Sequence, residues 1–170
     1  MKLKEEVKKE GMNKDLYDLF IDLIQFEINK LSFISSAKFY FYMHGMMNYK
    51  KFFKKMYKCC EKSKACLISY LMNSFENIPE FTIPALNIEF ESPQEIFEKL
   101  AELEDKYADK LNKIAETAFS ISDMKTLAYI LPKINEIDHI ACRAMEAVKN
   151  EHNPLDLIEN ESNNTCETSR

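Results

Sequence analysis

The chain has 170 residues, of which 46% are hydrophobic and 30% charged, and its formal net charge is −5. This length indicates one domain with a real core, and the composition excludes a disordered chain. The acidic total disfavours a nucleic-acid binder. The chain has two glycines, Gly11 and Gly45. Glycine-rich phosphate loops and multi-hairpin β folds are therefore almost excluded, because both need glycine for close backbone approach or positive φ.

The sequence shows no membrane or export signal. No segment approaches the ~20 apolar residues of a membrane span, and the first residues lack the apolar stretch of a secretory signal. The five cysteines are an odd number and match no zinc-binding spacing. We therefore expect a cytoplasmic protein with reduced thiols, and neither membrane nor nucleic acid as a partner.

Two long helical patterns begin the chain. Apolar residues spaced by three and four predict a helix over about residues 13–47, capped by Asn13, and a second over about residues 49–75. Very few residues separate them, so we expect antiparallel neighbours. The expected seams comprise Phe20, Ile24, Ile28, Leu31, Phe39, Tyr42 and Met46 in the first helix, and Phe53, Met56, Cys60, Ser63, Leu67 and Leu71 in the second.

A proline-containing segment separates the second helix from the third. Residues 77–92 cannot be helical throughout, because Pro79 and Pro84 interrupt them. The sequence Ser92-Pro93-Gln94-Glu95 then predicts a helix start, with serine as N-cap, proline in the first turn and Glu95 completing a capping box. The third helix is expected to reach about Ala118.

The fourth helical pattern follows Ser122, which we expect to be its N-cap, and continues to about Asn153. Pro132 removes one backbone hydrogen bond, at a cost of ~3 kcal/mol in a regular helix. Because seam residues Ile130 and Ile134 continue on both sides, we expect the helix to bend there and go on. The predicted organisation is an extension over 1–12, a bundle over 13–152, and a short helical segment with a polar tail over 153–170.

The long connection determines the predicted topology. A helix of about 27 residues is ~40 Å long, and about fifteen extended residues reach ~50 Å. The connection can therefore cross the length of the bundle and leave the second and third helices parallel. We predict an all-α, ferritin-like four-helix bundle with one long crossover between helices 2 and 3. The alternative is an up-down bundle with a loose loop.

Bundles of this type hold two iron ions through inward glutamates and Glu-x-x-His pairs. The literal match, Glu136-Ile137-Asp138-His139, is a poor candidate, because Glu136 lies more than about 100° from the centre of its helix seam. Glu104 lies within about 50° of the third helix's seam and is the one acidic residue that we expect to face inward. A buried carboxylate needs a partner. We expect Lys38, or failing that Lys64, to pair with it.

The chain resembles the non-haem, bacterial-type branch of the ferritin family over roughly residues 16–150. The resemblance is carried by LIQFEINKLSFISS (23–36), FFKKMYKCCEKSKACLISYL (52–71), SPQEIF (92–97), KLNKIAETAF (110–119) and residues 123–144. Ferritins are similar bundles that assemble into hollow cages, oxidise ferrous iron inside each bundle and store the mineral. The resemblance therefore implies self-association or co-assembly with other ferritin-like subunits.

The resemblance also implies where iron ligands would lie. The positions that match the family's ligands are Leu31 in the first helix, Cys60 and Ser63 in the second, Glu104 in the third, and Glu136, Ile137 and Ile140 in the fourth. Glu104 and Glu136 keep a carboxylate, and they are the candidate residual metal ligands. Iron is the one candidate cofactor, and no catalytic residue is predicted.

We therefore expect a catalytically silent ferritin-like subunit of an iron-storage type cage. One alternative is a repurposed bundle that acts as a structural or partner-binding protein with no iron role. Another is an active di-iron enzyme, which the replaced ligands disfavour.

Overall fold

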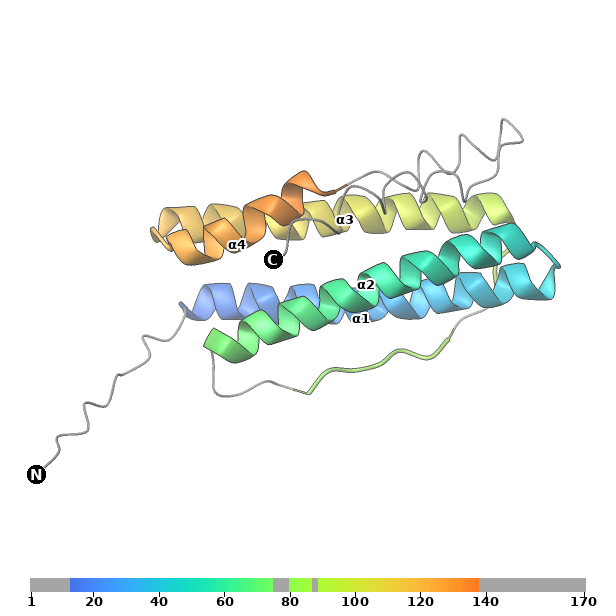
Figure 1. Cartoon of the computed structure of the whole chain (residues 1–170), viewed down its shortest axis with the longest axis horizontal. Coiled ribbons are helices and arrows are strands. Elements are labelled where there is room, and N and C mark those ends of the chain that lie inside the picture. The colour runs from blue at the N-terminus through green and yellow to red at the C-terminus, as the bar shows by residue number, and fades with distance from the viewer. Residues whose placement is uncertain (1–12, 75–79, 87–88, 138–170) are drawn as a thin grey trace, which may run out of the picture.

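The computed structural model describes residues 13–74, 80–86 and 89–137, and these residues form an all-α bundle (Figure 1). Its helices are α1 (Lys14–Met43), α2 (Met47–Ser74), α3 (Pro93–Ser120) and α4 (Met124–Asn135). The predicted fold class is confirmed. The expected N-terminal extension and C-terminal segment, and the part of the fourth helix that holds His139 and Ile140, lie outside the described residues.

The first two helices form the predicted antiparallel hairpin. The Asn13 side chain accepts a hydrogen bond from the backbone N–H of Asp15 at 2.8 Å and so caps α1. At the other end, the N–H of Met46 donates to the Phe41 carbonyl at 2.9 Å, and Gly45 adopts a φ of +70°. Glycine permits this left-handed conformation without steric cost, so the chain reverses within three residues.

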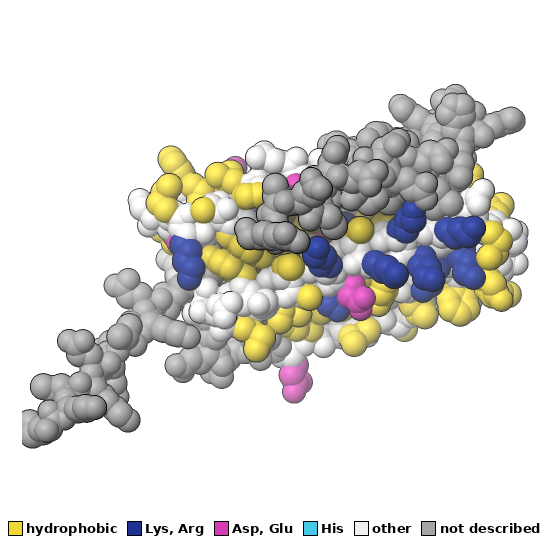
Figure 2. Space-filling view, in the orientation of Figure 1, with side chains coloured by type: hydrophobic (Ala, Val, Ile, Leu, Met, Phe, Trp, Pro, Cys, Tyr) yellow, Lys and Arg dark blue, Asp and Glu magenta, His cyan; other side chains and the backbone are white. Residues whose placement is uncertain are grey.

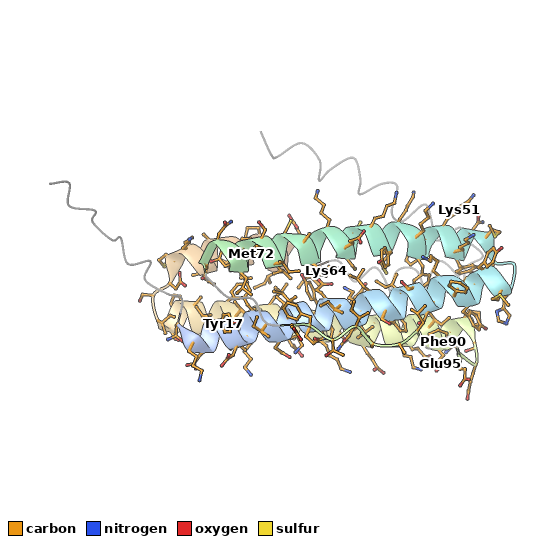
Figure 3. The ribbon with its side chains drawn as sticks, turned by 90° about the horizontal axis from the view of Figure 1, so that it is seen from below. Tyr17, Lys51, Lys64, Met72, Phe90 and Glu95 are labelled. Atoms are coloured by element: carbon orange, nitrogen blue, oxygen red, sulfur yellow. The ribbon has the colours of Figure 1, made fainter. Side chains whose placement is uncertain are left out.

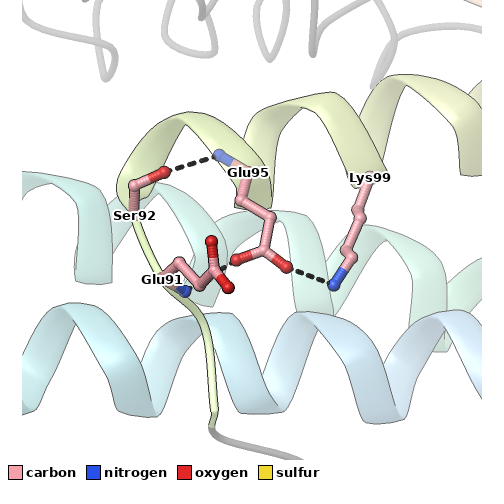
Figure 4. A network of polar contacts seen from close by, with 4 residues as sticks. All are labelled: Glu91, Ser92, Glu95 and Lys99. Carbon is pink, nitrogen blue, oxygen red and sulfur yellow. Dashed lines mark hydrogen bonds and ion pairs between the residues drawn. The ribbon is translucent and has the colours of Figure 1, made fainter.

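The start of α3 follows the predicted capping pattern, except that Glu95 binds the backbone one residue before the cap (Figure 4). Ser92 Oγ accepts a hydrogen bond from the N–H of Glu95 at 3.2 Å. The Glu95 carboxylate accepts from the N–H of Glu91 at 2.7 Å, one residue before the cap, and also binds Lys99. This polar network fixes the point at which the crossover becomes helical.

The crossover lies along α1. The Gln25 side chain donates to the carbonyl of Thr82 at 2.7 Å and accepts from its N–H at 3.0 Å, and Ser32 Oγ donates to the carbonyl of Pro84 at 3.3 Å. Gln25 thus satisfies the backbone of an extended segment as a neighbouring strand would. In Figure 1, α2 and α3 consequently run in the same direction, as the length of the connection predicted.

The start of α4 corrects one prediction. Asp123, and not Ser122, is the N-cap: its carboxylate accepts from the N–H of Thr126 at 3.0 Å. Ser122 adopts a φ of +60° in the turn, a conformation in which it makes the reversal between α3 and α4 and does not cap the helix.

The end of α4 corrects a second prediction. The helix continues through Pro132 but ends at Asn135, so Glu136 and Ile137 lie beyond it instead of continuing a bent helix. Proline cannot donate to the Ala128 carbonyl, and its ring crowds that turn. The Pro132 carbonyl still accepts from the N–H of Glu136 at 3.0 Å, which completes one last turn.

Two apolar clusters fill the bundle. The cluster near the α1–α2 turn is aromatic and contains Phe41, Phe52, Phe53 and Phe97. The cluster at the opposite end is built by Leu16, Phe20, Leu23, Ile24, Ile28, Leu67, Leu71, Leu111, Ile114, Ala118 and Ile130. Side chains occupy the space between the helices along the length of the bundle (Figure 3). None of the described helices combines the length and apolar character that crossing a membrane requires.

Candidate functional site

Polar side chains form a layer where the two apolar clusters meet. On α1 these are Glu27 and Lys30, on α2 Cys60 and Ser63, and on α3 Glu104 and Tyr107. On α3, Glu104 and Tyr107 lie between Leu100 of one cluster and Leu111 of the other, and Cys60 is the last α2 residue of the aromatic cluster. Buried polar groups require compensating partners, so the contacts within this layer determine what it can do.

Glu27 is at the centre of the layer and is 1% exposed. Its Oε1 accepts a hydrogen bond from Ser63 Oγ at 3.3 Å, and Tyr107 also hydrogen-bonds the carboxyl group. Its Oε2 is buried and has no hydrogen-bond partner among the described residues. Burial raises the pKa of Glu27 above its ordinary value, although Lys30, Ser63, Tyr107 and the more distant Lys133 on α4 oppose the shift.

Lys30 brings a positive charge into the same layer. Its side chain is 8% exposed, and its Nζ lies 4.8 Å from the centroid of the Tyr107 ring. The electron-rich face of the ring attracts the ammonium, and the ammonium charge favours the ionised form of both Glu27 and Cys60. Among the described residues, Lys30 is thus the one buried cation, the internal cation of the bundle.

Cys60, Ser63 and Tyr107 contribute uncharged groups to the layer. Burial is the main cause that raises the pKa of the Cys60 thiol to about 12, and the charges of Glu27 and Glu104 add to it. The thiol therefore keeps its proton at neutral pH. Ser63 Oγ and Tyr107 Oη are 3.3 Å apart, and burial also raises the pKa of Tyr107.

The predicted ligand positions do not all meet. Leu31, Cys60 and Glu104 are buried and Ser63 is half-buried, but Glu136 is exposed at the end of α4 and Ile137 lies after it. Glu136 is thus not part of the layer, because α4 ends one turn past Pro132. Lys38 Nζ lies 5.3 Å from the centroid of the Tyr57 ring, and Lys64 is half-buried. A lysine partner for Glu104 stays a prediction.

Glu27 and Lys30 were missed because charged residues were assigned to the outer face. The resemblance placed the first helix's carboxylate position at Leu31, whereas the structure places the Glu27 carboxylate, one turn earlier, against Ser63. The sequence did contain a signal. A second stripe runs through α1 with alternating spacings of four and three, and Glu27 and Lys30 occupy its middle: Leu16, Phe20, Leu23, Glu27, Lys30, Ile34, Ala37 and Phe41.

The described part of the layer does not fit a pair of iron ions. A di-iron site in a bundle draws carboxylates and imidazoles from all four helices. Here the two buried carboxylates share their layer with an ammonium, a protonated thiol and hydroxyl groups. Among the described residues, no three His, Cys, Asp or Glu side chains are grouped as metal ligands would be.

Solved ferritin structures share this fold. An iron-soaked variant of PmFTN matches with a TM-score of 0.69 at 18% identity, over 80% of this chain and 92% of that one. The open-pore ferritin of the archaeon Archaeoglobus fulgidus gives 0.70 at 15% identity, over 92% and 90%. A humanized archaeal ferritin gives 0.70 at 18%, over 89% and 87%. No protein-family model matches the sequence, and no curated protein sequence is similar to it. The chain has the ferritin fold.

Proposed function

We propose that this chain is a ferritin-like subunit of an iron-storage-type assembly and has no ferroxidase centre of its own. The observation that supports this is the buried ammonium of Lys30 in the same layer as the Glu27 carboxylate, within a ferritin fold. Iron is then cargo that the assembly holds, and its oxidation takes place elsewhere.

The chemistry of the layer supports the proposal. Ferrous iron, as the substrate of oxidation, prefers carboxylate oxygens and imidazole nitrogens. Ser63 presents a neutral hydroxyl, and Cys60 presents a thiol that keeps its proton. Lys30 adds a positive charge that repels a second cation at short range. A ferrous ion that entered the layer would meet two carboxylates and an ammonium that already counters their charge.

Iron oxidation tests the silent site directly. Stoichiometric ferrous iron in aerated buffer should be oxidised at the same rate with and without the purified chain. Glu27→Ala provides the control, because a rate that depends on the layer must fall in this variant. Saturable oxidation that Glu27→Ala abolishes would show that the layer is an active centre.

Size-exclusion chromatography with iron analysis tests the assembly. A large particle that carries iron after loading supports the storage role. A small metal-free species supports the alternative, a bundle repurposed to bind a protein partner. The alternative has one observation in its favour: Phe119, Ile121 and Met124 are 72%, 41% and 65% exposed around the α3–α4 turn, and such exposed apolar residues are typical of contact surfaces.

A further inference from the structure

Two tyrosines form a stacked pair near the end of the bundle where α3 and α4 join. The rings of Tyr70, on α2, and Tyr129, on α4, have centroids 3.9 Å apart and planes inclined by 9°. The ring of Phe20, on α1, lies 5.3 Å from the first and 6.5 Å from the second. Aromatic pairs ordinarily keep their centroids ~4.5–7 Å apart and avoid direct face-to-face contact, because their electron-rich faces repel. The packing therefore holds this tyrosine pair closer than two neutral rings prefer.

A chain of hydrogen bonds leads from Tyr70 to a carboxylate. Thr126 Oγ1 donates to Asp123 Oδ2 at 2.6 Å, and a hydroxyl group has a single proton to donate. The 2.9 Å hydrogen bond between Tyr70 Oη and Thr126 Oγ1 therefore has the tyrosine as its donor. The chain runs in one direction, from the phenol through the buried threonine to Asp123, and a charged acceptor strengthens its last bond. Tyr70 thus has a path by which its proton can leave.

Two nearby tyrosines are less suited than Tyr70 to lose an electron and a proton. The Tyr129 hydroxyl is buried and has no hydrogen-bond partner in the described part of the chain, and Lys133 Nζ lies 4.9 Å from the centroid of its ring. Tyr107 hydrogen-bonds a carboxyl group of the polar layer, but the Lys30 ammonium lies over its ring. An ammonium is attracted by the electron density of a ring face, so it opposes the loss of an electron from that ring. Of these three tyrosines, Tyr70 is the best placed to be oxidised.

The distribution of surface charge favours the same residue. On the face drawn in Figure 2, lysine side chains gather on the half of the molecule where α2 begins. Tyr70 lies near the other end of that helix. Positive charge opposes the removal of an electron from a nearby group, and Tyr70 lies away from most of the lysine charge on this face.

We propose that the tyrosine pair is a one-electron oxidation site at which Tyr70 becomes a neutral phenoxyl radical. The oxidant takes one electron from the stacked rings, and the phenolic O–H bond of Tyr70 breaks. The phenolic proton forms an O–H bond on Thr126 Oγ1, while the proton that Thr126 held forms an O–H bond on Asp123 Oδ2. The products are a neutral radical, a neutral carboxyl group and the reduced oxidant. No new charge is left in the apolar surroundings, where it would be costly.

The stacked geometry favours the oxidised state. A ring that has lost electron density no longer repels the electron-rich face of its neighbour. The class of oxidant is the radicals that ferrous iron forms from hydrogen peroxide. The inference rests on the proposed storage role for this oxidant alone, because iron held as cargo would supply it, whereas the tyrosine pair and its proton path need no iron.

Photochemical oxidation of the full chain tests the site without iron. A ruthenium tris-bipyridyl photo-oxidant, with persulfate as the electron acceptor, removes single electrons, and electron paramagnetic resonance of frozen samples detects tyrosyl radicals. Tyr70→Phe keeps the stack but has no phenolic proton, and Asp123→Asn keeps an N-cap side chain but loses the charged acceptor. The matched control is Tyr49→Phe, because Tyr49 also stacks on a ring, that of Phe41, with 5.0 Å between centroids. Circular dichroism establishes that each variant is folded.

We expect a tyrosyl radical signal in the parent chain and in Tyr49→Phe, and the loss of most of this signal in Tyr70→Phe. Asp123→Asn should give less radical, because no carboxylate then accepts the proton. The parent should form the radical more slowly in deuterium oxide, since a proton moves with the electron, and a purely structural role of Tyr70 would not produce this isotope effect. Ferrous iron with hydrogen peroxide, in place of the photo-oxidant, should give the same spectrum.

Three results would overturn the proposal or part of it. A signal that survives in Tyr70→Phe, or that falls equally in Tyr49→Phe, would show that the tyrosine pair is not the oxidation site. A signal that only the photo-oxidant produces would leave the pair as an oxidation site and show that the iron-derived oxidant is wrong. The storage role fails separately: a small metal-free species in size-exclusion chromatography would remove it, and the radical signal of the photo-oxidised chain would still support the site.

Discussion

Glu27 and Lys30 are charged residues at positions where the helix pattern predicts apolar ones, and the charge of Lys30 partly offsets the burial of Glu27. The Glu27 carboxyl is almost fully buried, and one of its oxygens has no hydrogen-bond partner in the part of the chain that the structure describes. The Lys30 ammonium lies over Tyr107 in the same layer. Desolvation nevertheless outweighs the attraction, because it is the largest cause acting on the pKa of Glu27 and it raises that pKa. Burying the Glu27 carboxyl in the layer therefore lowers the stability of the folded chain.

Replacing Glu27 by glutamine should stabilise the chain at neutral pH. The pKa of Glu27 is raised above its ordinary value of 4.5 in the folded chain. Its carboxyl group therefore stabilises the folded chain below pH 4.5, and this stabilisation is lost as the pH rises through the folded pKa. Glu27→Gln should raise the free energy of unfolding by about 1 kcal/mol at pH 7 and flatten its decline above pH 4.5. Urea titrations across pH measure this. Glu102→Gln, an exposed change on α3, is the control, and equal gains in both variants would contradict the argument.

Removing the Lys30 ammonium alone should destabilise the chain. Lys30→Met keeps the length of the side chain but leaves Glu27 without the charge that most favours its ionised form, and an uncompensated buried charge costs ~3 kcal/mol. Adding Glu27→Gln should recover most of the loss, because neither charge then stays unpaired. A double-mutant cycle by urea unfolding measures the coupling. Additive effects of the two changes would mean that the residues do not interact.

The helix boundaries show what a sequence pattern can and cannot resolve. Ser92-Pro93 predicted the start of α3 at the correct residue, because proline in the first turn and the glutamate of the capping box all support one position. At the start of α4, Ser122 and Asp123 are both good capping residues, and periodicity cannot separate positions one apart. The backbone conformation decides: Ser122 has positive φ, and Asp123 reaches Thr126.

A pair of substitutions tests this assignment. Asp123→Ala should cost about 1 kcal/mol, because the N–H and the hydroxyl of Thr126 both lose their acceptor. Ser122→Gly should be neutral or stabilising by up to about 1 kcal/mol, since glycine adopts positive φ without strain. Thermal unfolding of the two variants measures both effects. A larger loss from Ser122→Gly than from Asp123→Ala would restore Ser122 as the cap.

At the scale of the whole molecule, the sequence predicted the bundle better than its interior. Helix spacing and the reach of the proline-containing segment determined the topology, because most of the expected seam residues are buried. Phe39 and Tyr42, two expected seam residues of α1, are instead 47% and 53% exposed. The candidate site was predicted only in part. Cys60, Ser63 and Glu104 were assigned inward from their seam positions, whereas Glu27 and Lys30 were not, because a rule that places charge outside cannot identify charges that compensate each other inside.

The same compensation leads to a prediction about metal dependence. With Lys30 as its internal cation, the folded chain needs no divalent ion to balance Glu27, so dialysis against EDTA should leave the thermal midpoint unchanged. Self-association, in contrast, should make the midpoint rise with protein concentration, because assembly stabilises only the folded chain. Differential scanning calorimetry at two concentrations, with and without EDTA, measures both effects. A midpoint that falls on chelation would show that metal ions hold the bundle together. A midpoint independent of concentration, in a chain that elutes as a small species, would remove the support for a storage subunit.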